Sequence, residues 1–127
     1  MQKENLFEYA VIRVVPRVER EEFLNVGVVL YCSAKKFVQM KFLLDRERLT
    51  ALSATLDISE VETYLEAFEL ICLGEERGGP ISKLPIAERF RWLTATRSTI
   101  VQTSKVHPGL CGEPGEKLEQ LYAQLVL

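Results

Sequence analysis

The spacing of the hydrophobic residues changes near residue 45, and this change limits the folds that the chain can adopt. Before it, three segments carry β-branched and aromatic residues in runs of strand length, at 7–15, 25–32 and 37–44. After it, apolar residues recur at three- and four-residue steps as far as Gly74, which is typical of helices. Strands followed by helices predict an α+β fold.

The strand-like segments predict an antiparallel sheet. Only residues 33–36 separate the second segment from the third, which favours a hairpin. Residues 97–103, RSTIVQT, have the β-branched content of a fourth strand, whereas His107-Pro108-Gly109 is typical of a turn. We therefore expect an antiparallel sheet of about four strands, covered mainly on one face by three to four helices.

Residues that favour helix ends mark where those helices lie. Asp45 is a suitable N-cap for the first, and the Ser-x-x-Glu pattern at Ser59 is a capping box for a second helix that ends at Gly74. Pro85 and Pro114 each suit the first turn of a later helix. The apolar stripes of these helices are expected to pack on the sheet.

Length, charge and cysteine content exclude several classes of protein. A chain of 127 residues predicts one domain over 1–127, and a net charge of -2 gives no general attraction to nucleic acids. No apolar run could span a membrane and the N-terminus lacks the order of a signal peptide, so we expect a cytoplasmic protein. One histidine and three scattered cysteines supply no metal-ligand set, so neither metal nor cofactor is expected.

Arg13 is a candidate functional residue because it interrupts an apolar strand face. By the period of two, Tyr9, Val11 and Val15 share its side of the strand. A charge in such a row needs a partner. We expect an ion pair with Glu19, Glu21 or Glu22; the alternative is that Arg13 points into a cleft.

A second group of polar residues lies between 89 and 110. Arg97, Ser98 and His107 there supply a planar fork of donors, a hydroxyl and a titratable imidazole, a set that suits a phosphate or carboxylate. The structural alternative is that these side chains satisfy backbone carbonyls and cap turns, and we favour it. Cys111 lies near His107 in the sequence, so a thiol and imidazole pair is a further alternative.

Three segments resemble a bacterial family known as domain of unknown function 3037. They are residues 9–32, residues 89–110 and the ending 113–127. The resemblance includes an Arg-x-x-Pro motif at 13–16 and an Asn-Val-Gly motif that begins at Asn25. It also includes Arg97-Ser98 and Val106-His107, so that it extends over nearly the whole chain.

The resemblance implies a genomic context rather than an activity. The family has no established activity or catalytic residues that could be assigned to this chain. Its members are often encoded beside proteins similar to HipA-like serine/threonine kinases. This implies a small accessory partner of such a kinase.

These observations lead to one main hypothesis and two alternatives. The main one is a non-enzymatic protein that binds another protein, for which a HipA-like kinase is the candidate, through residues 89–107. The first alternative is a binding domain or an enzyme that takes a small anion or a nucleotide phosphate in one cleft, formed by Arg13, Arg97, Ser98 and His107. The second is a homo-oligomer joined through the apolar ending LVL. The candidate binding residues are Arg13, Asn25, Arg97, Ser98 and His107, and no catalytic residue is named.

Overall fold

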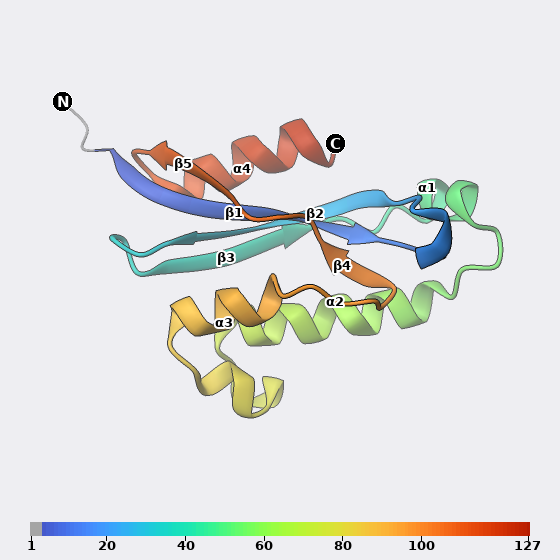
Figure 1. The fold of residues 1–127 in the computed structure, drawn as a ribbon, viewed down its shortest axis with the longest axis horizontal. Helices are drawn as coiled ribbons and strands as arrows, with labels where there is room; N and C mark the ends of the chain where they lie inside the picture. The colour runs from blue at the N-terminus through green and yellow to red at the C-terminus, as the bar shows by residue number, and fades with distance from the viewer. Residues whose placement is uncertain (1–3) are drawn as a thin grey trace.

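The computed structural model describes residues 4–127, which form a five-stranded antiparallel sheet with helices on both faces (Figure 1). Residues 1–3, which the expected domain 1–127 includes, lie outside this description. The strands are β1 (Asn5–Val14), β2 (Leu24–Cys32), β3 (Phe37–Phe42), β4 (Val101–Thr103) and β5 (His107–Cys111). Their order is β3-β2-β1-β4, and β5 also pairs with β1, so β4 and β5 share one edge of the longest strand. The α+β class expected from the sequence is confirmed.

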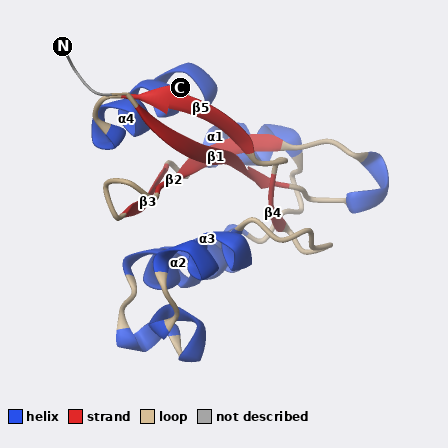
Figure 2. Ribbon diagram, turned by 60° about the vertical axis from the view of Figure 1, so that its left-hand side comes forward, coloured by secondary structure: helices blue, strands red, loops and turns tan. Residues whose placement is uncertain are grey.

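Four α-helices accompany the sheet: α1 (Arg46–Leu52), α2 (Ile58–Leu73), α3 (Ile86–Leu93) and α4 (Pro114–Leu125). Three short 3-10 turns, η1 (Val18–Arg20), η2 (Glu76–Gly78) and η3 (Pro80–Lys83), lie in the connections. In Figure 2, α2 and α3 lie on one side of the sheet and α4 lies on the other. The sheet is therefore the middle layer.

Alternating side chains of the central strands supply two hydrophobic cores, one on each face. Ala10, Ile12 and Val29 point into the larger core, where helices α1, α2 and α3 contribute Leu49, Leu65 and Phe90, among others. The smaller core joins the opposite face to α4. Its buried residues include Phe7, Val28, Leu30, Cys32, Leu118, Leu121 and Tyr122. Burial on both faces explains why β2 reads as an almost continuous apolar run.

Two expectations for the last third of the chain are wrong. The fourth strand is shorter than predicted, because 97–100 are loop and only 101–103 pair with β1. Residues 107–111 form strand β5 rather than a turn. Pro108 is tolerated because β5 lies at an edge, where a missing N–H need not face β1. Gly109 leaves room for the buried Phe7 ring, which would have to shift for a larger residue, since a Cβ would come within 2.6 Å of it.

The helix boundaries agree more closely with the sequence. Helix α2 ends at Gly74, which adopts a left-handed conformation with φ 72°, as a C-terminal glycine commonly does. Its start is corrected: the N-cap is Asp57, which accepts a hydrogen bond from the Glu60 N–H at 3.3 Å, and not Ser59. Asp45 caps α1 as expected, and α4 begins at Pro114.

Candidate functional site

Arg13 lies on β1 on the face opposite to Ile12 and Val14, and the expected ion pair is absent from the described residues. Its guanidinium carbon lies 4.0 Å from the centre of the Phe23 ring, and no carboxylate oxygen of residues 4–127 lies within 4.0 Å of its nitrogens. Glu22, one of the expected partners, pairs with Arg20 instead. The Nε atom of Arg13 is buried without a hydrogen-bond acceptor. Arg13 is thus a partly buried cation without a counter-charge in contact.

Asn25 pairs with Arg13 across the two central strands, so the structure does bring these two candidate residues together. The Asn25 Nδ2 atom donates to the Leu125 carbonyl at 3.2 Å, so one of the carbonyls that the last turn of α4 leaves without a helical partner has a hydrogen-bond donor. Its Oδ1 atom is buried without a donor. A pocket of about 280 Å³ opens beside Arg13. It is lined by Arg13, Val15, Val18, Glu21, Phe23, Gln102 and Thr103.

Arg97 lies on the other face of the sheet from Arg13. Its guanidinium carbon is 4.9 Å from the centre of the Phe68 ring and 4.6 Å from that of Trp92, and its Nη2 donates to the Trp92 carbonyl. Burial among these groups lowers the pKa of Arg97. Because Phe68 belongs to the larger core, this arginine helps to close that core at the end of α3. Ser98, the next residue, is exposed in the following loop.

His107 begins β5 and pairs with Tyr9 on β1, with ring centres 5.3 Å apart. It is exposed and lies on the α4 side of the sheet. The predicted cleft that would join Arg13, Arg97, Ser98 and His107 is therefore not formed, since these side chains lie on two faces and in separate strands and loops. Cys111 lies four residues along the same strand, roughly 13 Å from His107, so the imidazole cannot activate its thiol.

Other polar side chains between residues 89 and 110 form hydrogen bonds with the backbone. Thr94 donates to the Phe90 carbonyl at 2.9 Å, and Thr99 donates to the Val101 carbonyl at 2.8 Å. Ser104 accepts from the Val11 N–H at 2.8 Å and thereby extends the pairing of β1. The structural alternative for this polar group fits these contacts.

Two exposed apolar side chains lie next to one another at the β5 edge of the sheet. They are on the same face as helix α3, but α3 does not cover them. Leu6 on β1 and Leu110 on β5 are directly opposite one another, and 64% and 58% of their surfaces are exposed. Beside them Pro108 pairs with Glu8, whose carboxylate accepts from Arg91 of α3 at 2.7 Å. This hydrogen bond raises the pKa of Arg91. We call Leu6, Glu8, Arg91, Pro108 and Leu110 the edge patch.

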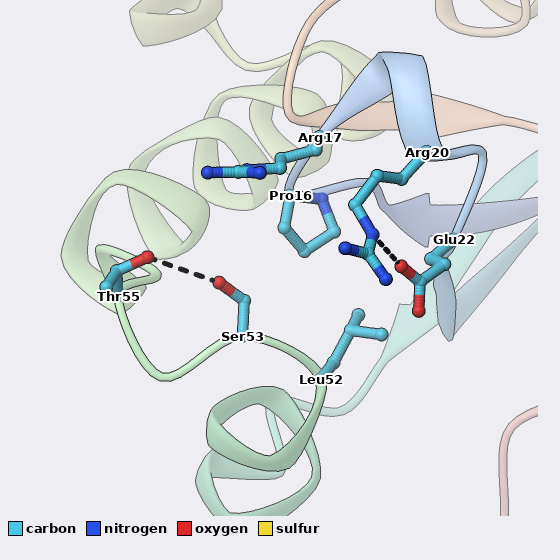
Figure 3. A pocket seen from close by; sticks show the side chains of 7 residues that line it. All are labelled: Pro16, Arg17, Arg20, Glu22, Leu52, Ser53 and Thr55. Atoms are coloured by element: carbon cyan, nitrogen blue, oxygen red, sulfur yellow. Dashed lines mark hydrogen bonds and ion pairs between the residues drawn. The ribbon is translucent and has the colours of Figure 1, made fainter.

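A polar pocket of about 250 Å³ lies between the segment around turn η1 and residues 52–55 (Figure 3). We call it the arginine pocket; its lining residues are Pro16, Arg17, Arg20, Glu22, Leu52, Ser53 and Thr55. The Ser53 and Thr55 hydroxyl oxygens are 3.5 Å apart. Of these residues, Glu22 was expected only as a partner of Arg13, and Pro16 only as the end of the Arg-x-x-Pro motif. The pocket itself was not predicted, because two segments at least thirty positions apart, 16–22 and 52–55, build it. The only local signal is the pair of arginines that follows Pro16.

Two negative findings concern the described part of the chain. Residues 4–127 contain no group of three or more His, Cys, Asp or Glu side chains placed to hold a metal ion. No helix within the same range has the length and apolar character needed to cross a bilayer.

The fold and these surfaces define a small α+β protein in which most polar side chains of the 94–104 region bond to its own backbone. Residues 9–126 match the model of the family described as Protein of unknown function (DUF3037), so the chain belongs to this family. No curated protein and no solved structure matches it significantly. Arg13 and Asn25, which the sequence analysis placed in two separate motifs, are directly paired across strands β1 and β2.

Proposed function

We propose that this protein is a non-enzymatic accessory protein that binds another protein through the edge patch. The observation that carries this proposal is the Leu6 and Leu110 pair. Two large apolar side chains that lie in register, each more than half exposed, form a contiguous apolar surface rather than scattered single residues. The separation of Arg13, Arg97 and His107 further favours binding over catalysis.

The geometry of the edge favours contact through side chains. Pro108 interrupts the row of backbone donors along β5, so a partner cannot readily add a strand there. A pocket of about 300 Å³ opens next to Leu6, lined by Leu6, Phe7, Glu8, Tyr31, Ser33 and Ala34. An apolar side chain of a partner could fill it, as anchor residues do at the centres of interfaces. The ion pair between Arg91 and Glu8 would form the polar rim.

The partner that we propose is a HipA-like serine/threonine kinase, because the family resemblance implies this genomic context. A second copy of the chain is the competing occupant of the same patch. Size-exclusion chromatography of the protein alone separates the two cases, since a homodimer would elute at twice the mass of 14.5 kDa.

The test is co-expression of the tagged protein with the HipA-like kinase encoded beside it. Leu110→Lys should weaken the complex by at least about tenfold, because it places a charge in an apolar contact. Leu73→Lys is the matched control, since Leu73 is 55% exposed at the end of α2. A complex that resists Leu110→Lys, or the absence of a complex with the wild type, would contradict the proposal.

A further inference from the structure

We propose that the arginine pocket binds a small molecule that carries a phosphate group. This site is separate from the edge patch and from the proposed partner binding. The proposal starts from the arginine side chains. The chain has nine arginines, all within the described residues.

Seven of the nine arginines have polar partners. Five have a carboxylate oxygen within 4.0 Å, namely Arg20, Arg46, Arg48, Arg77 and Arg91. Arg89 and Arg97 donate to backbone carbonyls. Of the other two, Arg13 stacks on Phe23. Arg17 is exposed and, within residues 4–127, has no ion pair, hydrogen bond or ring contact, and it lines the arginine pocket.

The pocket gathers the donors that a tetrahedral oxyanion needs. Figure 3 shows Arg17 and Arg20 on one segment and the Ser53 and Thr55 hydroxyls on the other, around a shared space. A guanidinium offers a planar fork of N–H donors that matches two phosphate oxygens, and a hydroxyl supplies a third, shorter-range donor. Leu52 gives the floor an apolar element.

Glu22 lowers the positive charge of the arginine pocket and so limits its affinity for phosphate. Its carboxylate is paired with Arg20, so these two charges cancel and Arg17 leaves a net charge of +1 among the lining residues. A phosphate can compete with Glu22 for Arg20. The replacement Glu22→Gln should therefore strengthen phosphate binding, because it removes a negative charge and frees a guanidinium.

The size of the pocket narrows the ligand class. A volume of about 250 Å³ is below the roughly 300–1,000 Å³ typical of sites for drug-sized ligands. It suits inorganic phosphate or a phosphomonoester with a short organic body, rather than a whole nucleotide.

The experiment is a calorimetric titration of the full chain with inorganic phosphate and, separately, with glycerol phosphate. Arg17→Ala should weaken binding of either probe by about tenfold or more, and Glu22→Gln should strengthen it several-fold. Arg77→Ala is the matched control: Arg77 is exposed and pairs with Glu75 two residues away, as Arg20 pairs with Glu22. Because Arg17 and Arg77 are exposed, both variants should fold, which circular dichroism checks.

Four results decide the outcome. Tighter binding of glycerol phosphate would support a phosphomonoester, and equal binding would support inorganic phosphate; both support the site. No heat with either probe would overturn the proposal. Equal weakening by Arg17→Ala and Arg77→Ala would also overturn it, since it would show non-specific attraction. Leu110→Lys should leave phosphate binding unchanged, because Leu110 does not line the arginine pocket. A failure of the phosphate proposal is therefore distinguishable from a failure of the edge patch.

Discussion

At the scale of single residues, Arg13 is the clearest conflict between sequence and environment. It lies in an apolar row, stacks on the Phe23 ring, and buries its Nε without an acceptor. An unsatisfied buried donor costs about 1–3 kcal/mol, which exceeds the roughly 0.5–1 kcal/mol of a cation and ring contact at a partly exposed site. Folding therefore does not require this guanidinium.

Arg13→Met should raise the free energy of unfolding by about 1 kcal/mol, because methionine keeps an aromatic contact with Phe23 and removes the orphan donor. Urea denaturation measures this. Arg89→Met is the control: Arg89 donates to the Ile71 and Cys72 carbonyls at the end of α2, so its loss should lower stability by about 1–3 kcal/mol. Equal destabilisation by both variants would show that Arg13 has a structural role that its contacts do not reveal.

Cys72 gives a prediction for pH. Burial raises the pKa of its thiol from 9.0 to about 12, although the nearby Arg89 charge acts in the opposite direction. Between pH 9 and 12 the unfolded chain loses this proton and the folded chain keeps it. Stability should therefore fall as pH rises, and this thiol contributes about 1.4 kcal/mol per pH unit.

Denaturation at pH 8 and pH 10 tests this prediction. The loss of stability between the two should be about 1 kcal/mol smaller in Cys72→Ala than in the wild type. Cys72→Ala also removes core volume, but that effect is the same at both pH values and cancels in the difference. An identical loss in both proteins would mean that the folded thiol ionises normally.

At the scale of elements, the sequence predicted the strand positions and helix ends that depend on residues close together in the chain. Strands β1, β2 and β3, the C-terminal end of α2 and the start of α4 lie close to their predicted positions, because alternation, Gly74 and Pro114 act within a few residues. Strand β5 was missed because His107-Pro108-Gly109 has turn residues, and only pairing with β1 makes it a strand. The cap of α2 was misplaced because Asp57 and Ser59 are both good caps two residues apart.

The two caps can be distinguished by substitution. Asp57→Ala should lower the free energy of unfolding by about 1 kcal/mol, because the Glu60 N–H loses its acceptor. Ser59→Ala should change it by no more than about 0.5 kcal/mol, as surface substitutions usually do. Thermal or urea denaturation of the two variants measures the contrast. A larger effect of Ser59→Ala would restore the capping box predicted from the sequence.

At the scale of the whole molecule, the sheet is a middle layer, and its faces separate the candidate residues. Arg13 and Asn25 lie opposite one another because β1 pairs with β2. The sequence pattern of each strand taken alone does not give the register that brings these two residues together. The edge patch and the arginine pocket each depend on segments far apart in the sequence, at 6–8 with 91 and 108–110, and at 16–22 with 52–55. No local pattern brings such segments together, so neither surface could be predicted.

Hydrogen exchange of the protein, free and in complex with the HipA-like kinase, tests the proposed interaction most directly. We predict slower exchange in the complex for peptides that cover β5 and the first half of β1, where Leu110 and Leu6 lie. The peptide that ends α2, which contains Leu73, should not change. Protection confined to α2 or α4, with β5 exchanging as in the free protein, would contradict the edge patch as the site of binding.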